Sequence, residues 1–326
     1  MRELYYSKAV NEALDEELAR DPAVVLIGED IGPYGGAFGV TRELFAKYGP
    51  ERIWETPISE NSFTGLAVGA AMLGVRPVVE IMFMDFIALA LDQLLNSAGK
   101  LHYMYGGQVK VPMVLRTPGG AKGGYGPSHS QMLSNLLVGI PGLKIVAPSN
   151  AAQAKGLLKS AIRDPNPVIV IENKRLYPQK GEVPSDDDFT LPLDRAVVVS
   201  PGTDLSLFCY SAMTPVCVAV KNAFLQTGVN LEVVDLVSLQ PLDTETLFAS
   251  LRKTGRAVIV EEACLTGGVG AELSALFAEH CLDSLDAPIV RVAAKDVPIP
   301  SSLALEKLVL PQPEDIIAAV KENLAY

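Results

Sequence analysis

Short, continuous apolar runs recur along this chain, and longer stretches with helical periodicity separate them. Apolar residues at helical spacing run through positions 9–18, Asp21-Pro22 ends that helix, and the apolar run 24–27 follows as a strand. Further strands are expected at residues 77–81, 112–115, 143–146 and 168–171, and helices at 86–105 and 151–163. Strands that are apolar throughout and alternate with helices predict an α/β fold with a parallel sheet covered on both faces.

Chain length and one polar segment predict two domains. The 326 residues exceed one ordinary core, and 49% hydrophobic residues supply enough apolar surface for two. Residues 177–193 break the pattern with Pro, Gly and acidic residues and are expected to form a linker. We therefore expect a first domain at 1–185 and a smaller α/β domain at 194–326. The second domain has expected strands at 205–209, 231–235 and 257–260.

Charge and cysteine content exclude several classes of partner and site. The net charge of −11 argues against nucleic acid or an anionic membrane as the main partner, because either would be repelled at long range. No apolar run reaches the roughly 20 residues of a membrane helix. The N-terminus lacks signal or transit composition, which predicts a cytoplasmic protein. The four cysteines form no C-x-x-C pair and no zinc spacing, so free thiols are expected.

Glu60 is the first candidate for chemistry, because it stands at the mouth of the Gly- and Ala-rich helix 64–72. A capping role suits Ser59 or Asn61, since short side chains accept hydrogen bonds from free helical N–H groups. Glu60 is long enough to reach out of the turn. From this pattern alone, Glu60 is either an acid that faces a cofactor or an ordinary carboxylate that interacts with the helix dipole.

Glycine-rich loops supply further candidates. Residues 28–36 follow the first strand, where ligands bind in parallel sheets, and include Glu29, but they lack both nucleotide-binding glycine signatures. Residues 118–127 hold five glycines, which let backbone approach a ligand, and His129 follows just before an expected helix. His129 is either an acid or base near neutral pH or a surface histidine. Residues 266–270 suit either an anion at a helix start or a close-packed turn.

Several separated motifs occur in the order that one known family has. They lie at residues 55–60, 67–72, 76–77, 92–93, 129–131, 141–144 and 154–164. With these motifs, the chain resembles the β subunit of thiamine-diphosphate-dependent 2-oxo acid dehydrogenases over essentially its whole length. The resemblance implies a parallel-sheet pyrimidine-binding domain followed by a transketolase-like C-terminal domain.

The same resemblance gives the candidate residues their roles. It implies that Glu60 hydrogen-bonds N1′ of the cofactor's aminopyrimidine and so promotes proton removal from the thiazolium ring. It implies that Glu29 also binds the cofactor and that Phe86 stacks on the aminopyrimidine, although core packing at a helix start is the alternative for Phe86. His129 matches the active-site histidine that exchanges protons with cofactor-bound intermediates and with the incoming lipoyl group.

Metal sites and partners also follow from the resemblance. The positions that hold a structural potassium ion in the family, largely through backbone carbonyls, match Met113, Ala161, Asp164 and Asn166. The family's Gly-Asp-Gly motif, which binds the diphosphate through Mg²⁺, does not occur in this sequence. A separate α subunit is therefore expected to hold the Mg²⁺ and the diphosphate. The implied assembly is an α₂β₂ heterotetramer whose paired β C-terminal domains bind the lipoyl acyltransferase component.

The expected activity is oxidative decarboxylation of a 2-oxo acid with acyl transfer to a lipoyl domain, and pyruvate is the first expectation. Residues 123–129 depart from the Ala-Ala-Gln-His version common in pyruvate enzymes, so branched-chain 2-oxo acids and acetoin stay open. Two other classes are a truncated carboligase of the transketolase type and a non-catalytic scaffold subunit. The joint presence of Glu60, Phe86 and His129 argues against a scaffold, which has no use for all three.

Overall fold

The structure is a computed structural model that describes residues 1–326, and the chain divides into two compact units. The first unit contains residues 1–119 and 139–193, and the second contains residues 120–138 and 194–326. The second unit thus includes the glycine-rich segment that carries His129. This segment lies far in sequence from the rest of the second unit. The domain boundaries expected from the sequence, 1–185 and 194–326, stay a prediction.

A parallel sheet forms the centre of the first unit. Its strands are β2 (Val24–Gly28), β3 (Ile53–Glu55), β4 (Arg76–Glu80), β5 (Val114–Gly119), β6 (Lys144–Val146) and β7 (Val168–Asn173). They lie in the order β6-β7-β5-β4-β2-β3, and every pairing between them is parallel. β2, β5 and β7 are buried along their whole length. This confirms the parallel α/β sheet that the continuous apolar runs predict.

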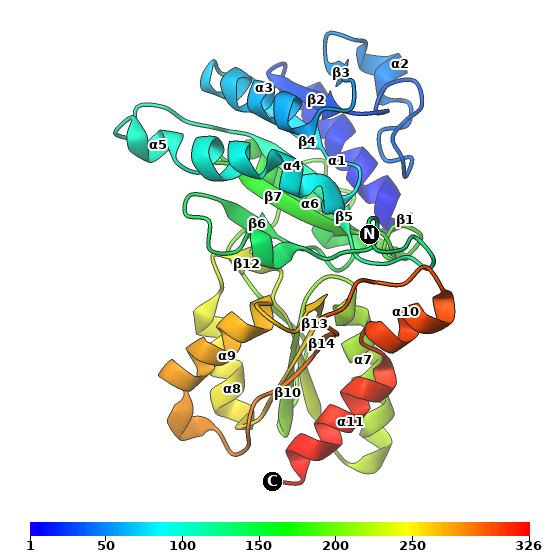
Figure 1. Cartoon of the computed structure of the whole chain (residues 1–326), viewed down its shortest axis with the longest axis vertical. Helices are drawn as coiled ribbons and strands as arrows, with labels where there is room; N and C mark the ends of the chain where they lie inside the picture. Colours follow the sequence, from blue (N-terminus) through cyan, green and yellow to red (C-terminus); the bar gives the residue numbers. More distant parts are fainter. The chain divides into compact units, whose positions relative to one another are not determined.

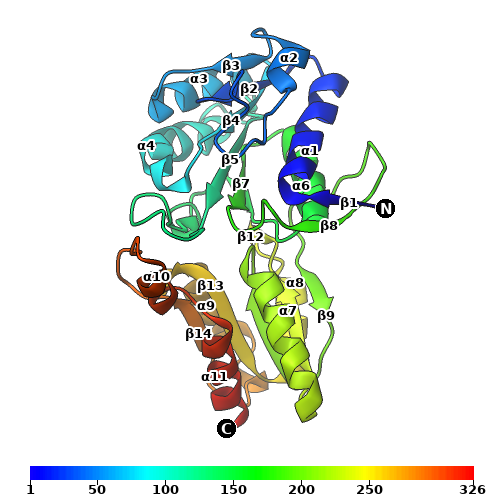
Figure 2. The ribbon, with the colours of Figure 1, turned by 90° about the vertical axis from the view of Figure 1, so that its right-hand side faces the viewer.

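Helices cover both faces of this sheet (Figure 1, Figure 2). α1 (Tyr6–Arg20) and α6 (Ala151–Arg163) pack together on one face, and α3 (Glu60–Met72) and α4 (Ile87–Asp92) lie on the other. α6 has the predicted bounds, and the Asn150 side chain caps it by accepting from the Gln153 N–H. Lys155 and Lys159 of α6 are buried because glutamates of α1 pair with both.

The helical stretch predicted at 86–105 is present, but the chain changes helical geometry several times there, so it is not one continuous α-helix. The segment contains the 3₁₀ turn η1 (Met84–Phe86), α4, the π-helix η2 (Gln93–Ala98) and α5 (Leu101–Met104). At the end of η2 the Gly99 N–H bonds to the Leu94 carbonyl at 2.9 Å, a spacing of five residues. A Cβ at Gly99 would lie 2.8 Å from the Pro141 carbonyl oxygen, so this close approach requires glycine.

Shorter elements complete the first unit. β1 (Arg2–Tyr5) pairs antiparallel with β8 (Lys180–Val183), and α2 (Leu44–Tyr48) precedes β3. β8 lies inside the segment expected to be a linker, so this polar stretch contains a strand. Strand β5 begins at Val114, two residues later than expected, and extends to Gly119.

The second unit is built on a five-stranded sheet in the order β14-β13-β10-β11-β9. Its strands are β9 (Val197–Ser200), β10 (Leu205–Cys209), β11 (Leu231–Asp235), β13 (Ala257–Cys264) and β14 (Val290–Ala294). β9 pairs antiparallel with β11, and the other pairings are parallel. The strands predicted at 205–209 and 231–235 are confirmed, whereas β13 runs four residues beyond the predicted end.

Four helices enclose this second sheet. α7 (Met213–Phe224) and α11 (Pro313–Leu324) lie on one face, and α8 (Thr244–Thr254) and α9 (Val269–His280) lie on the other (Figure 1, Figure 2). The remaining elements are η3 (Ser134–Leu136), η4 (Leu225–Thr227), β12 (Ser238–Gln240), η5 (Leu282–Ser284) and α10 (Leu303–Val309). All four cysteines are free thiols, as expected, and Cys264 is the exposed one.

None of the helices combines the length and the apolar character that crossing a membrane would require.

Candidate active site

Two buried carboxylates meet at the carboxyl edge of the first unit's sheet. Glu29 follows β2 directly and Glu60 begins α3, with exposed fractions of 7% and 6%. The Ser59 N–H donates a hydrogen bond to Glu29 Oε1 at 3.3 Å. Burial, and then the charge of Glu60, raises the pKa of Glu29, while the bond from Ser59 opposes the rise. A carboxyl group whose pKa is raised in this way holds its proton more tightly than an exposed one, which suits Glu29 to proton donation.

The start of α3 leaves Glu60 without a capping neighbour. Ser59 occupies the N-cap position, but its side chain makes no capping hydrogen bond. Its backbone, with φ −170° and ψ 63°, departs from the conformation that aims a cap side chain at the helical N–H groups. Asn61 instead accepts from the Gln93 amide at 3.0 Å. The capping role expected for Ser59 or Asn61 is therefore wrong.

Two buried hydroxyl groups beside these carboxylates have no hydrogen-bond partner. Thr56 is tied to β2 by its N–H bond to the Gly28 carbonyl at 2.9 Å, and Thr64 lies one turn after Glu60 on α3. Oγ1 of both threonines is buried and unpaired. Buried polar groups in native proteins are nearly always paired. Two unpaired hydroxyls next to buried carboxylates fit a polar ligand bound at this edge of the sheet.

Phe86 lies at the border of a group of aromatic rings in the first unit. It ends η1, precedes α4 and is half-buried. Its ring contacts Phe83 edge to face with centroids 6.5 Å apart, and Phe83 contacts Phe38 at 5.4 Å. Lys174 Nζ lies 5.2 Å from the Phe83 centroid. Phe83 and Phe86 are both half-buried, so neither ring is fully enclosed by the core of the first unit.

A charged cluster inside the sheet is not among the residues that the sequence pattern singles out. Arg116 of β5 donates two parallel hydrogen bonds to Glu172 of β7, both 2.7 Å, and also pairs with Glu80 at the end of β4. Tyr177 donates to Glu172 at 2.6 Å. Burial, and then the charge of Glu172, raises the pKa of Tyr177 well above its usual range, so it stays a donor. In the sequence, a charged residue inside, or at the end of, an apolar strand is the feature that could have indicated this cluster.

His129 belongs to the second unit, so the sequence candidates are divided between the two units. Its ring is half-buried, and Nδ1 lies 3.0 Å from Ser128 Oγ. The helix expected directly after His129 is wrong. The Gln131 carbonyl accepts the Gly120 N–H at 3.0 Å, which closes the glycine-rich loop and leaves that carbonyl out of any helical ladder. Only the 3₁₀ turn η3 follows.

The loop at residues 266–270 is a close-packed turn filled by a carboxylate of the protein. The N–H groups of Val269 and Gly270 at the start of α9 donate to Glu261 at 3.0 and 2.9 Å. Burial raises the pKa of Glu261, and these hydrogen bonds oppose the rise. Glu261 therefore stabilises the helix start in place of an external anion, and the close-packed interpretation is confirmed.

The four residues matched to a potassium site gather at the amino edge of the first unit's sheet, away from the carboxyl edge where the glutamates lie. The Met113 carbonyl accepts from the Val168 N–H at 3.0 Å, and the Ala161 carbonyl accepts from the Asp164 N–H at 3.3 Å. Asp164 Oδ1 binds the Asn166 backbone and side chain at 2.8 and 3.0 Å. Each carbonyl has a second lone pair, and the carbonyl end of α6 favours a cation.

Comparisons with known proteins agree with this two-unit architecture. Residues 2–180 match the family "Transketolase, pyrimidine binding domain" and residues 194–316 match "Transketolase, C-terminal domain". The chain is 48% identical over 321 residues to a pyruvate dehydrogenase E1 component subunit beta of Gracilaria tenuistipitata var. liui, a match that covers 98% of this chain and 99% of the relative. This chain belongs to the pyruvate dehydrogenase E1 β family. The buried glutamate pair lies within the pyrimidine-binding domain of that family.

Other relatives extend this picture of the E1 β family. The chain is 47% identical to the corresponding subunit of Porphyra purpurea, covering 98% of this chain and 97% of the relative. It is 44% identical to "Pyruvate dehydrogenase E1 component subunit beta-1, mitochondrial" of Arabidopsis thaliana, with 98% and 89% covered. Among solved structures, a "Split gene transketolase, inactive beta4 tetramer" superimposes with a TM-score of 0.79 at 25% identity, covering 99% of this chain and 98% of that one.

Proposed function

We propose that this chain is the β subunit of a pyruvate dehydrogenase E1 component. With an α subunit it binds thiamine diphosphate, decarboxylates pyruvate oxidatively and transfers the acetyl group to a lipoyl domain. The observation that carries this proposal is the buried Glu29–Glu60 pair, with its unpaired threonine hydroxyls, in a pyrimidine-binding domain. Pyruvate is the proposed substrate because the relatives at 47–48% identity are pyruvate dehydrogenase subunits.

The candidate residues of the first unit have distinct tasks in this proposal. Thiamine diphosphate, when bound, supplies a carbon nucleophile and an electron sink for decarboxylation. Glu60 accepts or donates a proton at N1′ of the aminopyrimidine, and Glu29, whose pKa is raised, keeps a proton available to the pair. Phe86 offers an aromatic surface against which a flat ring can stack. The Thr56 and Thr64 hydroxyls provide further polar contacts at the same edge.

His129 is proposed as the group that exchanges protons with the reacting substrate and the lipoyl group. A histidine changes charge near neutral pH, which suits proton donation and acceptance in turn. Ser128 Oγ contacts Nδ1 at 3.0 Å and so restricts the rotation of the ring. Its position on a loop, rather than in the sheet, gives it access to a group delivered from a partner.

The proposed assembly is an α₂β₂ heterotetramer. Because this chain has no Gly-Asp-Gly motif, the α subunit is proposed to hold the diphosphate and its Mg²⁺. The lipoyl acyltransferase component is the proposed docking partner of the C-terminal domains. The cytoplasmic location expected from the sequence stays a prediction, and the word mitochondrial in the name of the Arabidopsis thaliana relative describes that protein.

A potassium ion is proposed at the amino edge of the first unit's sheet, held by the carbonyl oxygens of Met113, Ala161 and Asp164 with the side chain of Asn166. An ion that binds only the folded protein raises its melting temperature by mass action. We expect the chain to melt at a higher temperature in KCl than in choline chloride of equal ionic strength, and Asn166→Ala, which removes the one side-chain ligand, to reduce that difference. Equal melting temperatures in the two salts would contradict the site.

The function is tested by producing this chain with its α subunit and supplying thiamine diphosphate and Mg²⁺. Dye reduction is measured with pyruvate, a branched-chain 2-oxo acid and acetoin as alternative substrates. We expect activity with pyruvate, and only when both chains are present. Activity confined to another substrate would change the proposed specificity. A stable two-chain complex that is inert to all three would favour the scaffold role.

A further inference from the structure

The loop that carries His129 is held by carboxylates of the second unit's own C-terminal part. Residues 120–138 contain several glycines with positive φ, among them Gly123 (89°), Gly124 (84°) and Gly126 (74°). Such a segment has many accessible conformations when it is free. In the structure it nevertheless has a defined path, because side chains from β13, β14 and α10 contact it at successive points.

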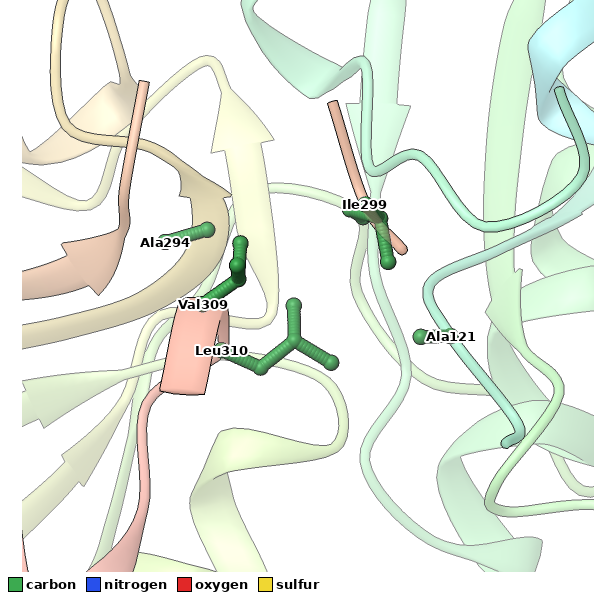
Figure 3. Close-up of a cluster of buried hydrophobic side chains, with 5 residues drawn as sticks. All are labelled: Ala121, Ala294, Ile299, Val309 and Leu310. Atoms are coloured by element: carbon green, nitrogen blue, oxygen red, sulfur yellow. The ribbon is translucent and has the colours of Figure 1, made fainter. Parts of the chain in front are cut away.

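Glu262 holds the base of the loop. This β13 residue is 3% exposed, and its Oε1 accepts the Ala121 N–H at 2.8 Å. The Ala121 side chain is fully buried in a cluster with Ala294 of β14, Ile299, Val309 and Leu310 (Figure 3). Figure 3 shows these five side chains contributed by the loop, by β14 and by the segment around α10. A charged acceptor and an apolar pocket therefore fix the same residue of the loop.

Glu306 holds the middle of the loop. It lies in the first turn of α10, is 5% exposed, and its Oε2 accepts the Gly124 N–H at 3.0 Å. Ser301 and Leu303, which lie just before Glu306 in the chain, are close neighbours of the glycines at 126 and 123. A Cβ at Gly126 would lie 2.4 Å from Ser301 Oγ, so no larger residue fits there without movement. His129 follows Gly126 within one turn of the chain, and its N–H donates to the Gly126 carbonyl at 3.3 Å.

Tyr210 holds the far end of the loop. Its hydroxyl group lies 3.0 Å from Ser134 Oγ and donates to Glu261 Oε2 at 3.2 Å. Glu261 is itself fixed by the N–H groups at the start of α9. His129 thus lies between Glu306, which fixes the loop before it, and Tyr210, which fixes the loop after it.

We propose that Glu306 and Glu262 are positioning residues for His129, which they hold in a reactive orientation by accepting backbone N–H groups of its loop. This inference rests on the proton-transfer role proposed for His129. Hydrogen bonds from N–H groups to a carboxylate are roughly twice as strong as those to a neutral acceptor. A catalytic group displaced by about 1 Å loses on the order of 100-fold in rate, so a loop this rich in glycine needs such fixed points.

The test compares Glu306→Ala, Glu306→Gln and Glu262→Ala in the complex with the α subunit, together with the control Glu322→Ala. Glu322 is an exposed glutamate on α11 of the same unit. We expect Glu306→Ala to lower kcat for acetyl transfer to the lipoyl domain about 10- to 100-fold with little change in KM for pyruvate. Glu306→Gln keeps an acceptor oxygen and should recover most of the activity, and Glu322→Ala should match the parent.

A double-variant cycle separates positioning from general damage. If Glu306 acts through His129, adding Glu306→Ala to His129→Ala costs almost nothing further, because the group being positioned is gone. An equal loss in both backgrounds would overturn the proposal. A change in the pH profile of kcat that appears in Glu306→Ala and recovers in Glu306→Gln would support it.

Hydrogen exchange gives a readout that does not depend on activity. Peptides that cover residues 121–126 should exchange faster in Glu306→Ala and Glu262→Ala than in the parent and in Glu322→Ala. Unchanged exchange in this peptide would overturn the anchoring, whatever the kinetics show. A parent complex that is inert to all substrates would instead overturn the proposed function, while the exchange data would still decide whether the carboxylates hold the loop.

Discussion

Glu29 and Glu60 are two buried carboxyl groups whose charges interact, and the proposed function assigns proton transfer to them. Both are at most 7% exposed, and the two carboxyl groups interact strongly enough for Glu60 to raise the pKa of Glu29. Ionisation of Glu29 is therefore opposed by its burial and by the neighbouring charge. The same residues at a surface would only interact with a helix dipole.

Glu60→Gln removes the ionisable group while keeping its shape. We expect assembly with the α subunit to survive and turnover to fall by about 100-fold or more, the range over which a lost acid–base group acts. Turnover with pyruvate and size-exclusion chromatography measure the two effects. The exposed Glu182 of β8 offers a matched control as Glu182→Gln. A Glu60→Gln complex with near-parental turnover would contradict the proposed role.

Glu29→Gln is expected to change how stability depends on pH. Because burial and Glu60 raise the pKa of Glu29 above its ordinary value of 4.5, the folded chain binds this proton more tightly than the unfolded chain. The stability from protonated Glu29 is full below pH 4.5 and is lost as pH rises through the raised pKa. The amide that replaces the carboxyl group cannot ionise, so the variant should gain melting temperature relative to the parent as the pH is raised from about 4.5 to about 7. A constant difference across that range would contradict this.

At the scale of elements, Arg116 joins three strands of the first unit. Its guanidinium pairs with Glu80 of β4 and Glu172 of β7, and all three side chains are buried. Burial raises the pKa of Glu80, and Arg116 opposes that rise. The arginine therefore supplies a positive charge and hydrogen bonds to two buried carboxylates on the strands that flank β5.

Arg116→Met should destabilise the chain by about 3–5 kcal/mol, because it leaves two buried carboxylates without their cation. Denaturant unfolding measures the loss. Adding Glu172→Gln to Arg116→Met removes one of the two buried carboxylates that have lost their cation, and should recover part of the stability. The free energy of unfolding that Glu172→Gln costs in the parent is the reference. If Glu172→Gln costs the same amount when it is added to Arg116→Met, the two residues are not coupled.

Local patterns predict the elements well and the assembly of the site only in part. The helix at 151–163 and the strands at 205–209 and 231–235 are confirmed, because their periodicity and flanking signals are local. The helix expected after His129 fails because the Gln131 carbonyl bonds to Gly120 instead. The ion cluster at Arg116 is invisible to periodicity, since its partners come from different strands. Glu60 and His129 are candidates from their local sequence patterns, whereas the roles of Glu29, Glu60, Phe86 and His129 come from the family resemblance and stay predictions.

At the scale of the whole molecule, the second unit is not one continuous stretch of chain, because it includes the loop of residues 120–138. Chain order places these residues in the N-terminal half, yet Glu262, Glu306 and Tyr210 bond to them and Ala121 fills an apolar cluster with four residues of the C-terminal half. A C-terminal fragment cut by chain order therefore lacks part of its own core and part of its hydrogen bonding.

A fragment of residues 194–326 should accordingly be stabilised by the peptide 120–138 added in trans. Without the peptide, the carboxylates of Glu262 and Glu306 lose N–H donors and the pocket around Ala294, Val309 and Leu310 is open to water. The peptide should bind the folded fragment and raise its melting temperature in a concentration-dependent way. A peptide of the same composition in scrambled order is the control. Ala121→Asp in the peptide should abolish the effect, because it places a charge in the apolar cluster. Identical melting temperatures with and without the peptide would mean that the second unit is complete without this loop.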